Sequence, residues 1–151
     1  MDNIIIIIIF IFCVLAIGII AHVSVHTEDR KKLNRYWSRS SISVAHKWKK
    51  AFPEKANEDI REFLQIFVDA FALSRKMLFK FEPDEKVLEV YKAIYSPSSR
   101  CDAMELETLF EHCAKRYNIK LESFWNDDTT LEEIFEIATK YSDSDNELIN
   151  T

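Results

Sequence analysis

The amino-acid sequence predicts an all-α protein, in which an N-terminal transmembrane helix precedes a small bundle of three to four helices. Two observations lead to this prediction. Residues 4–21 form an apolar run without a charged side chain, and the later chain repeats apolar residues at helical spacing. We therefore divide the chain into a transmembrane anchor over 1–26, a basic juxtamembrane linker over 27–55, a helical domain over 56–141 and a polar tail over 142–151.

The apolar run matches a bilayer in length. At a rise of 1.5 Å per residue, about 18 helical residues approach the thickness of the hydrocarbon layer. A cleaved signal peptide would begin with basic residues, whereas Asp2 precedes this run, and a core helix would show a polar face. We expect residues 1–26 to be an uncleaved anchor.

The segment after the run is strongly basic. Residues 27–55 hold nine Lys or Arg and three acidic residues. This bias predicts a single-pass inner-membrane protein with its C-terminal domain in the cytoplasm. Because Tyr36, Trp37 and Trp48 lie among these cations, we expect the segment to contact the lipid bilayer and its anionic headgroups, and not nucleic acid.

Two helices of the domain follow from apolar periodicity. One covers about residues 57–73, with Asn57 as a candidate N-cap. The second covers about 101–117, and Asn118 is suited to the left-handed position that ends a helix. Their apolar faces are formed by Ile60, Phe63, Leu64, Phe67, Val68 and Phe71, and by Ala103, Leu106, Phe110, Cys113 and Tyr117.

A third helix has the clearest start. Thr130 and Glu133 form a capping-box pattern, and Leu131, Ile134 and Phe135 continue it as an apolar face that we expect to end near Tyr141. Residues 83–91 predict a loop with a short helical piece. The tail over 142–151 is expected to be too polar to pack.

Composition argues against an enzyme. The only glycine, Gly18, lies in the apolar run, so the domain lacks the glycines that phosphate-binding loops and nucleophile elbows need. His22 and His26 share a helix face at i and i+4, but residues at the end of a span more often sit in the headgroup layer. We expect no metal and no cofactor.

Other reactive residue types have structural explanations. The acidic pairs 127–128 and 132–133 flank a helix start, where the helix dipole favours carboxylates. Cys113 lies on an apolar face and is expected in the core. Cys101 is either a small buried residue or, at a helix start, a thiol of lowered pKa.

The domain is acidic. Residues 56–151 hold 21 acidic and 11 basic side chains, a net charge of −10. Such a domain repels nucleic acid, so the expected partner is a basic protein surface.

Three segments of the domain form a recognisable series: Asp102-Ala103-Met104-Glu105-Leu106, Tyr117-Asn118-Ile119-Lys120-Leu121 and Thr129-Thr130-Leu131-Glu132-Glu133-Ile134. Through them the chain resembles acyl carrier proteins over about residues 57–141, most closely over the last forty or so. These segments are similar to the Asp-Ser-Leu-Asp-x-x-Glu-Leu start of the second helix, its Phe-Gly-Ile-x-Ile exit and a last helix opened by Thr. The chain also looks like a group of uncharacterised enterobacterial proteins with a carrier-like domain.

The resemblance fails at the residue that carries the prosthetic group. Arg100 stands at the position of the carrier serine, and Arg has no hydroxyl to modify. A shift by one residue offers Ser99, but the neighbouring residues then fit poorly. The resemblance still implies that an acidic second helix docks on basic partners, through Asp102, Glu105, Glu107 and Glu111.

Three functions remain open at this point. The first is a membrane-tethered, non-catalytic interaction module with a carrier-like acidic domain. The second is an acyl carrier with an atypical attachment serine, Ser99 or, as a less favoured alternative, Ser98. The third is a small membrane regulator that acts through its span.

Overall fold

The computed structural model describes residues 34–95 and 103–149, with side chains up to residue 140. The predicted anchor and the first residues of the predicted linker lie outside these ranges. Within them, every helix is too short or too polar to cross a membrane.

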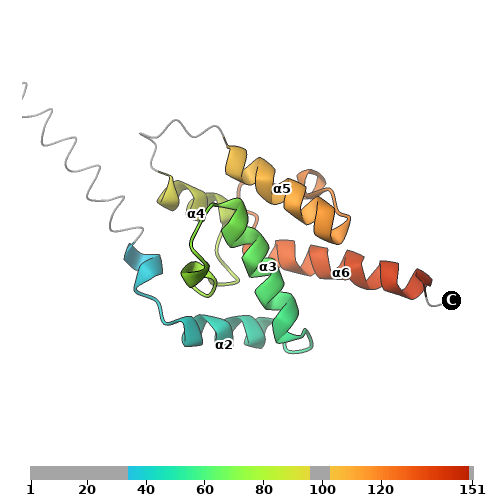
Figure 1. The fold of residues 1–151 in the computed structure, drawn as a ribbon, viewed down its shortest axis with the longest axis horizontal. Helices are drawn as coiled ribbons and strands as arrows, with labels where there is room; N and C mark the ends of the chain where they lie inside the picture. The colour runs from blue at the N-terminus through green and yellow to red at the C-terminus, as the bar shows by residue number, and fades with distance from the viewer. Residues whose placement is uncertain (1–33, 96–102, 150–151) are drawn as a thin grey trace, which may run out of the picture.

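The described chain is built from helices (Figure 1). Helix α3 runs through the middle of the molecule and contacts α5, which contacts α6 in turn. The only extended pairing among the described residues is an isolated antiparallel bridge between Lys86 and Thr130, so the all-α prediction is confirmed for this part of the chain. The helices are α2 (Ser41–Ala51), α3 (Asn57–Ala70), α4 (Val87–Ile94), α5 (Met104–Tyr117) and α6 (Leu131–Ile149), with 3-10 turns η1 (Arg75–Met77) and η2 (Leu121–Ser123).

Helix α3 buries the predicted apolar face but differs at both ends. Its N-cap is Ala56 and not Asn57, and the Ala56 N–H donates to the Asp59 carboxylate at 3.3 Å. The helix ends at Ala70, before the predicted residue 73, because the chain reverses through Ala72 at a φ of 49°. The buried residues of this face are Ile60, Phe63, Leu64, Phe67 and Val68.

Two predictions from local sequence concern the C-terminal end of α5 and the start of α6. Asn118 takes the left-handed conformation predicted for it, with φ 55° and ψ 37°. The capping box is also confirmed, because the Thr130 N–H donates to Glu133 at 2.8 Å and the Glu133 N–H donates to the Thr130 hydroxyl at 3.3 Å. The predicted end of α6 near Tyr141 is wrong, since its backbone stays helical to Ile149. No glycine or proline interrupts this stretch, and extending an existing helix is far easier than starting one.

Helix α2 was not predicted. It lies inside the segment predicted as a linker, yet Val44 and Trp48 are buried in the same core as α3 and α6. The Trp48 ring packs against Phe63 and Phe135 at centroid distances of 6.0 and 5.7 Å. Its indole N–H donates to the Phe81 carbonyl oxygen at 2.8 Å. The folded unit therefore begins well before residue 56.

This arrangement corrects the expected lipid contacts. Tyr36 is 6% exposed and packs on Phe81, so neither Tyr36 nor Trp48 is available to lipid headgroups. Two of the segment's cations also bind within the domain: Arg39 pairs with Glu85, and Lys47 pairs with Glu82 at 2.7 Å. The physical reason is that the aromatic side chains bury more apolar area in the core than at a membrane surface.

Candidate protein-interaction site

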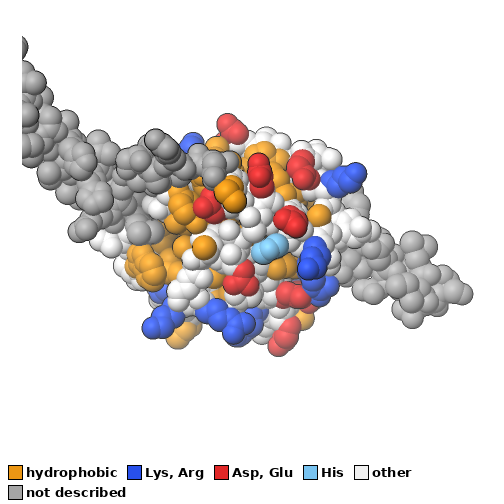
Figure 2. All heavy atoms as spheres, turned by 45° about the horizontal axis from the view of Figure 1, so that its top comes forward, with side chains coloured by type: hydrophobic (Ala, Val, Ile, Leu, Met, Phe, Trp, Pro, Cys, Tyr) orange, Lys and Arg blue, Asp and Glu red, His pale blue; other side chains and the backbone are white. Residues whose placement is uncertain are grey.

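Helix α5 carries an exposed ridge opposite its buried face. Met104, Glu107 and Glu111 occur at i, i+3 and i+7 and are all exposed, Met104 to 59%. The opposite face buries Leu109, Cys113 and Tyr117. In Figure 2, acidic and hydrophobic side chains lie side by side across this face of the molecule, and most basic side chains lie toward its margins. We call Met104, Glu107 and Glu111 the α5 ridge.

The carboxylates of α5 make no ion pair with another residue that the structure describes. Glu105, Glu107 and Glu111 have no salt bridge to any described residue. By contrast, Glu62 on α3 is held by Arg116 at 2.6 Å, and this hydrogen bond lowers the pKa of Glu62. The negative charge of the α5 ridge thus remains available to another molecule.

The structure separates the acidic residues that the sequence grouped together. Glu107 and Glu111 are exposed on the ridge, whereas Glu105 is half-buried on a flank of the helix. Arg116 occurs 11 residues after Glu105, on the same flank, where it pairs with Glu62. Glu105 is therefore less accessible than the resemblance implied.

Asp102, Arg100, Ser99 and Cys101 all lie outside the described residues. The described part of α5 begins after Ala103, which has a φ of 62° and makes no side-chain cap. Glu105 and Glu107 lie in the first turn, where their charge is favourable to the helix dipole.

Met104 is the part of the ridge that sequence reasoning missed. Its spacing from Glu107 and Glu111 was readable, but a methionine at a helix start is equally suited to a core. Leu109 was also missed as a core residue. The apolar face had been centred on Phe110, which instead packs at its edge against Trp125, at a centroid distance of 5.1 Å.

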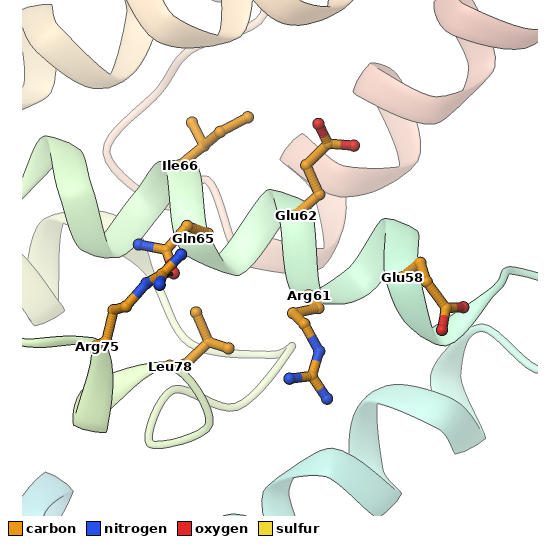
Figure 3. Close-up of a pocket in the computed structure, with 7 residues that line it drawn as sticks. All are labelled: Glu58, Arg61, Glu62, Gln65, Ile66, Arg75 and Leu78. Atoms are coloured by element: carbon orange, nitrogen blue, oxygen red, sulfur yellow. Dashed lines mark hydrogen bonds between the residues drawn. The ribbon is translucent and has the colours of Figure 1, made fainter.

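An open pocket of about 630 Å³ lies along α3 beside η1 (Figure 3). Figure 3 shows Glu62 and Ile66 pointing to one side of α3 and Arg61 to the other, so the charged groups do not converge. Arg75 donates to Gln65 at 3.1 Å, and Arg61 lies over the Phe79 ring. The lining residues are Glu58, Arg61, Glu62, Gln65, Ile66, Arg75 and Leu78.

A smaller open pocket, of about 360 Å³, lies where α6 begins. Its polar groups already bind within the fold. The Thr129 hydroxyl accepts the Asn126 N–H at 2.9 Å, and Glu133 caps α6. The Thr129 hydroxyl and the Glu133 carboxylate therefore have hydrogen-bonding partners within the protein and need no ligand.

The remaining candidates for chemistry have structural roles where they are described. Asp128 pairs with Lys86 at 2.6 Å, and Glu133 caps α6, so one member of each acidic pair has a structural role. Cys113 is buried as predicted, and burial raises the pKa of its thiol to about 12. No cluster of metal-ligating residues occurs within 34–95 or 103–140, and His22 and His26 lie outside these residues.

Comparisons of the whole chain with family models, curated proteins and solved structures give no match. The carrier resemblance therefore depends on the residues quoted above, and the candidate site depends on the geometry of α5.

Proposed function

We propose that this chain is a membrane-tethered, non-catalytic interaction module whose α5 ridge binds a basic protein partner. The observation that carries the proposal is that Glu107 and Glu111 lie exposed beside Met104 with no ion pair among the described residues.

The chemistry of the ridge supports this partner class. Carboxylates without internal cations attract a basic surface at long range, which speeds encounter and disfavours acidic partners. Met104, at the N-terminal end of the ridge, offers a flexible apolar contact that adapts to different surfaces. Charge and apolar contact together are typical of a protein interface.

The apolar run supports the tether. An anchor over residues 1–26 would hold the domain near the bilayer and raise its effective concentration toward a membrane-associated partner. Weak charge-based contacts are then sufficient for the partner to occupy the α5 ridge. The carrier resemblance adds that an acidic helix in this place is a docking surface in similar proteins.

In-cell crosslinking of the full chain tests the proposal. A photo-crosslinking amino acid replaces the exposed Ala114, which lies beside the ridge, and a second variant carries it at the exposed Ala51 of α2. We expect one specific crosslinked protein from Ala114, with a basic surface, and not from Ala51. Mass spectrometry identifies this protein.

Charge reversal provides the matched control. The double variant Glu107→Lys, Glu111→Lys should abolish the Ala114 crosslink, because the two lysines would repel the basic surface of the partner. Glu54→Lys with Glu136→Lys makes the same change in charge at exposed positions off the ridge and should leave the crosslink intact. Equal loss in both pairs, or no loss in either, would contradict a role for the ridge.

A further inference from the structure

Two large apolar side chains stand exposed near the start of the described chain. Trp37 is 47% exposed and Ile42 is 85% exposed, in a domain that buries its other tryptophans wholly or in part. They are five residues apart, on the helical turn over 34–37 and on the first turn of α2. In Figure 1 both turns lie at the same end of the molecule.

The same part of the chain carries two exposed cations. Arg35 and Lys50 are exposed and have no salt bridge to any described residue. Lys50 follows Ile42 by two helical turns on α2. The fold thus uses Arg39 and Lys47 internally and leaves Arg35 and Lys50 to solvent.

We propose that Trp37 and Ile42 enter the headgroup layer of an anionic bilayer while Arg35 and Lys50 bind its phosphates, which docks the domain on the membrane along α2 and the helical turn before it. This inference rests on the proposed tether. Tryptophan favours the membrane interface, and near-surface cations attract anionic lipid.

The chain outside the described residues supports a bilayer as the occupant. The apolar run ends at Ala21, only 16 positions before Trp37, and Arg30, Lys31 and Lys32 lie between them. A tether of this length keeps the start of α2 close to the membrane, so a weak surface contact is populated at high effective concentration.

Docking through α2 would also determine which surface of the domain faces the cytoplasm. Helices α2 and α5 lie at opposite edges of the molecule in Figure 1. A domain held by α2 would turn the acidic α5 ridge away from the anionic surface that repels it. The ridge would then be open to a protein partner.

Tryptophan quenching in the full-length protein tests the docking. The protein is reconstituted in vesicles of brominated phosphatidylcholine with phosphatidylglycerol, and in vesicles of brominated phosphatidylcholine alone. The chain has three tryptophans, and Trp48 is fully buried, so the signal that Trp37→Phe removes belongs to Trp37. We expect quenching of this component, about twofold stronger with the anionic lipid.

Two variants sharpen the result. Ile42→Ser with Lys50→Glu should reduce the quenching of Trp37 by about half or more, because it removes one apolar contact and reverses one charge. Lys120→Glu, a charge reversal at an exposed position beyond α5, should leave the quenching unchanged.

Flotation separates the two proposals. If the protein floats with vesicles but the wild type and Trp37→Phe are quenched alike, the tether stands and the docking is overturned. If the protein does not float, both the tether and the docking are overturned. The docking would also be overturned if Lys120→Glu lowered the quenching of Trp37 as much as the double variant does.

Discussion

The guanidinium of Arg39 binds both carboxylate oxygens of Glu85, with two N···O distances of 2.8 Å, across a sequence separation of 46 residues. Arg39 also donates to the Lys80 carbonyl oxygen at 2.8 Å, and the Lys80 ammonium donates to the Arg39 carbonyl oxygen. Glu85 accepts the Glu82 N–H at 2.8 Å. These contacts fasten the segment before α2 to the loop before α4.

We expect Arg39→Met to lower the free energy of unfolding by about 1–3 kcal/mol, because it leaves a largely buried carboxylate without its hydrogen-bonding partner. The side chains of Arg39 and Glu85 are only 13% and 11% exposed. Urea unfolding of the full chain in detergent, followed by near-UV circular dichroism, measures the change. Lys92→Met breaks an exposed pair with Glu89 and should change stability by less than about 0.5 kcal/mol. Equal effects of the two variants would refute the structural role of Arg39.

Trp48→Phe tests whether α2 belongs to the folded unit. The variant removes the indole N–H from the Phe81 carbonyl oxygen and leaves a gap beside Phe63 and Phe135. We expect a loss of about 2–4 kcal/mol in the free energy of unfolding. Trp37→Phe is the control, since Trp37 is exposed, and should be close to neutral. A neutral Trp48→Phe would mean that the segment does not pack as described.

The Cys113 thiol should resist alkylation in the folded protein. Burial raises its pKa from 9.0 to about 12, so its thiolate fraction at pH 8 is roughly a thousandfold below that of an unperturbed thiol. The measurement is the rate of iodoacetamide labelling in a Cys13→Ser, Cys101→Ser background, with and without urea. Labelling as fast in buffer as in urea would show that the thiol is accessible.

The ion pair of Glu62 and Arg116 predicts a small dependence of stability on pH. Arg116 lowers the folded-state pKa of Glu62, so the pair stabilises the fold above the ordinary pKa of Glu and loses this effect as pH falls through the lowered value. Both side chains are about half exposed, so the effect should stay below about 1 kcal/mol. Arg116→Met should destabilise the protein at pH 7 and much less at pH 3. The same loss at both values would exclude a charge effect.

Co-expression with a phosphopantetheinyl transferase tests the carrier alternative. We expect the intact mass to stay unchanged, because Arg100 occupies the position where the acyl carrier pattern has serine. An authentic acyl carrier protein, expressed alongside, should gain the mass of the arm. A gain in mass that Ser99→Ala abolishes would replace the interaction module with a working carrier.

Local signals in the sequence were sufficient for much of the domain. The face of α3, the capping box at Thr130 and Glu133 and the left-handed Asn118 depend on side chains a few residues apart. Such signals are complete within one segment, and the structure confirms them. The acidity of α5 was equally readable, although Met104 and the half-buried Glu105 were not assigned correctly.

By itself, the sequence determined the helical class of the described domain, the starts of α3 and α6 and the acidic character of α5. Only the tertiary structure decided that α2 is part of the core, and that Arg39 and Lys47 of the basic segment pair within the domain. The reason is that these residues have partners more than 30 positions further along the chain. Trp48 contacts Phe81 and Phe135, and Arg39 binds Glu85. A tryptophan among cations is equally suited to a membrane surface until such distant partners are known.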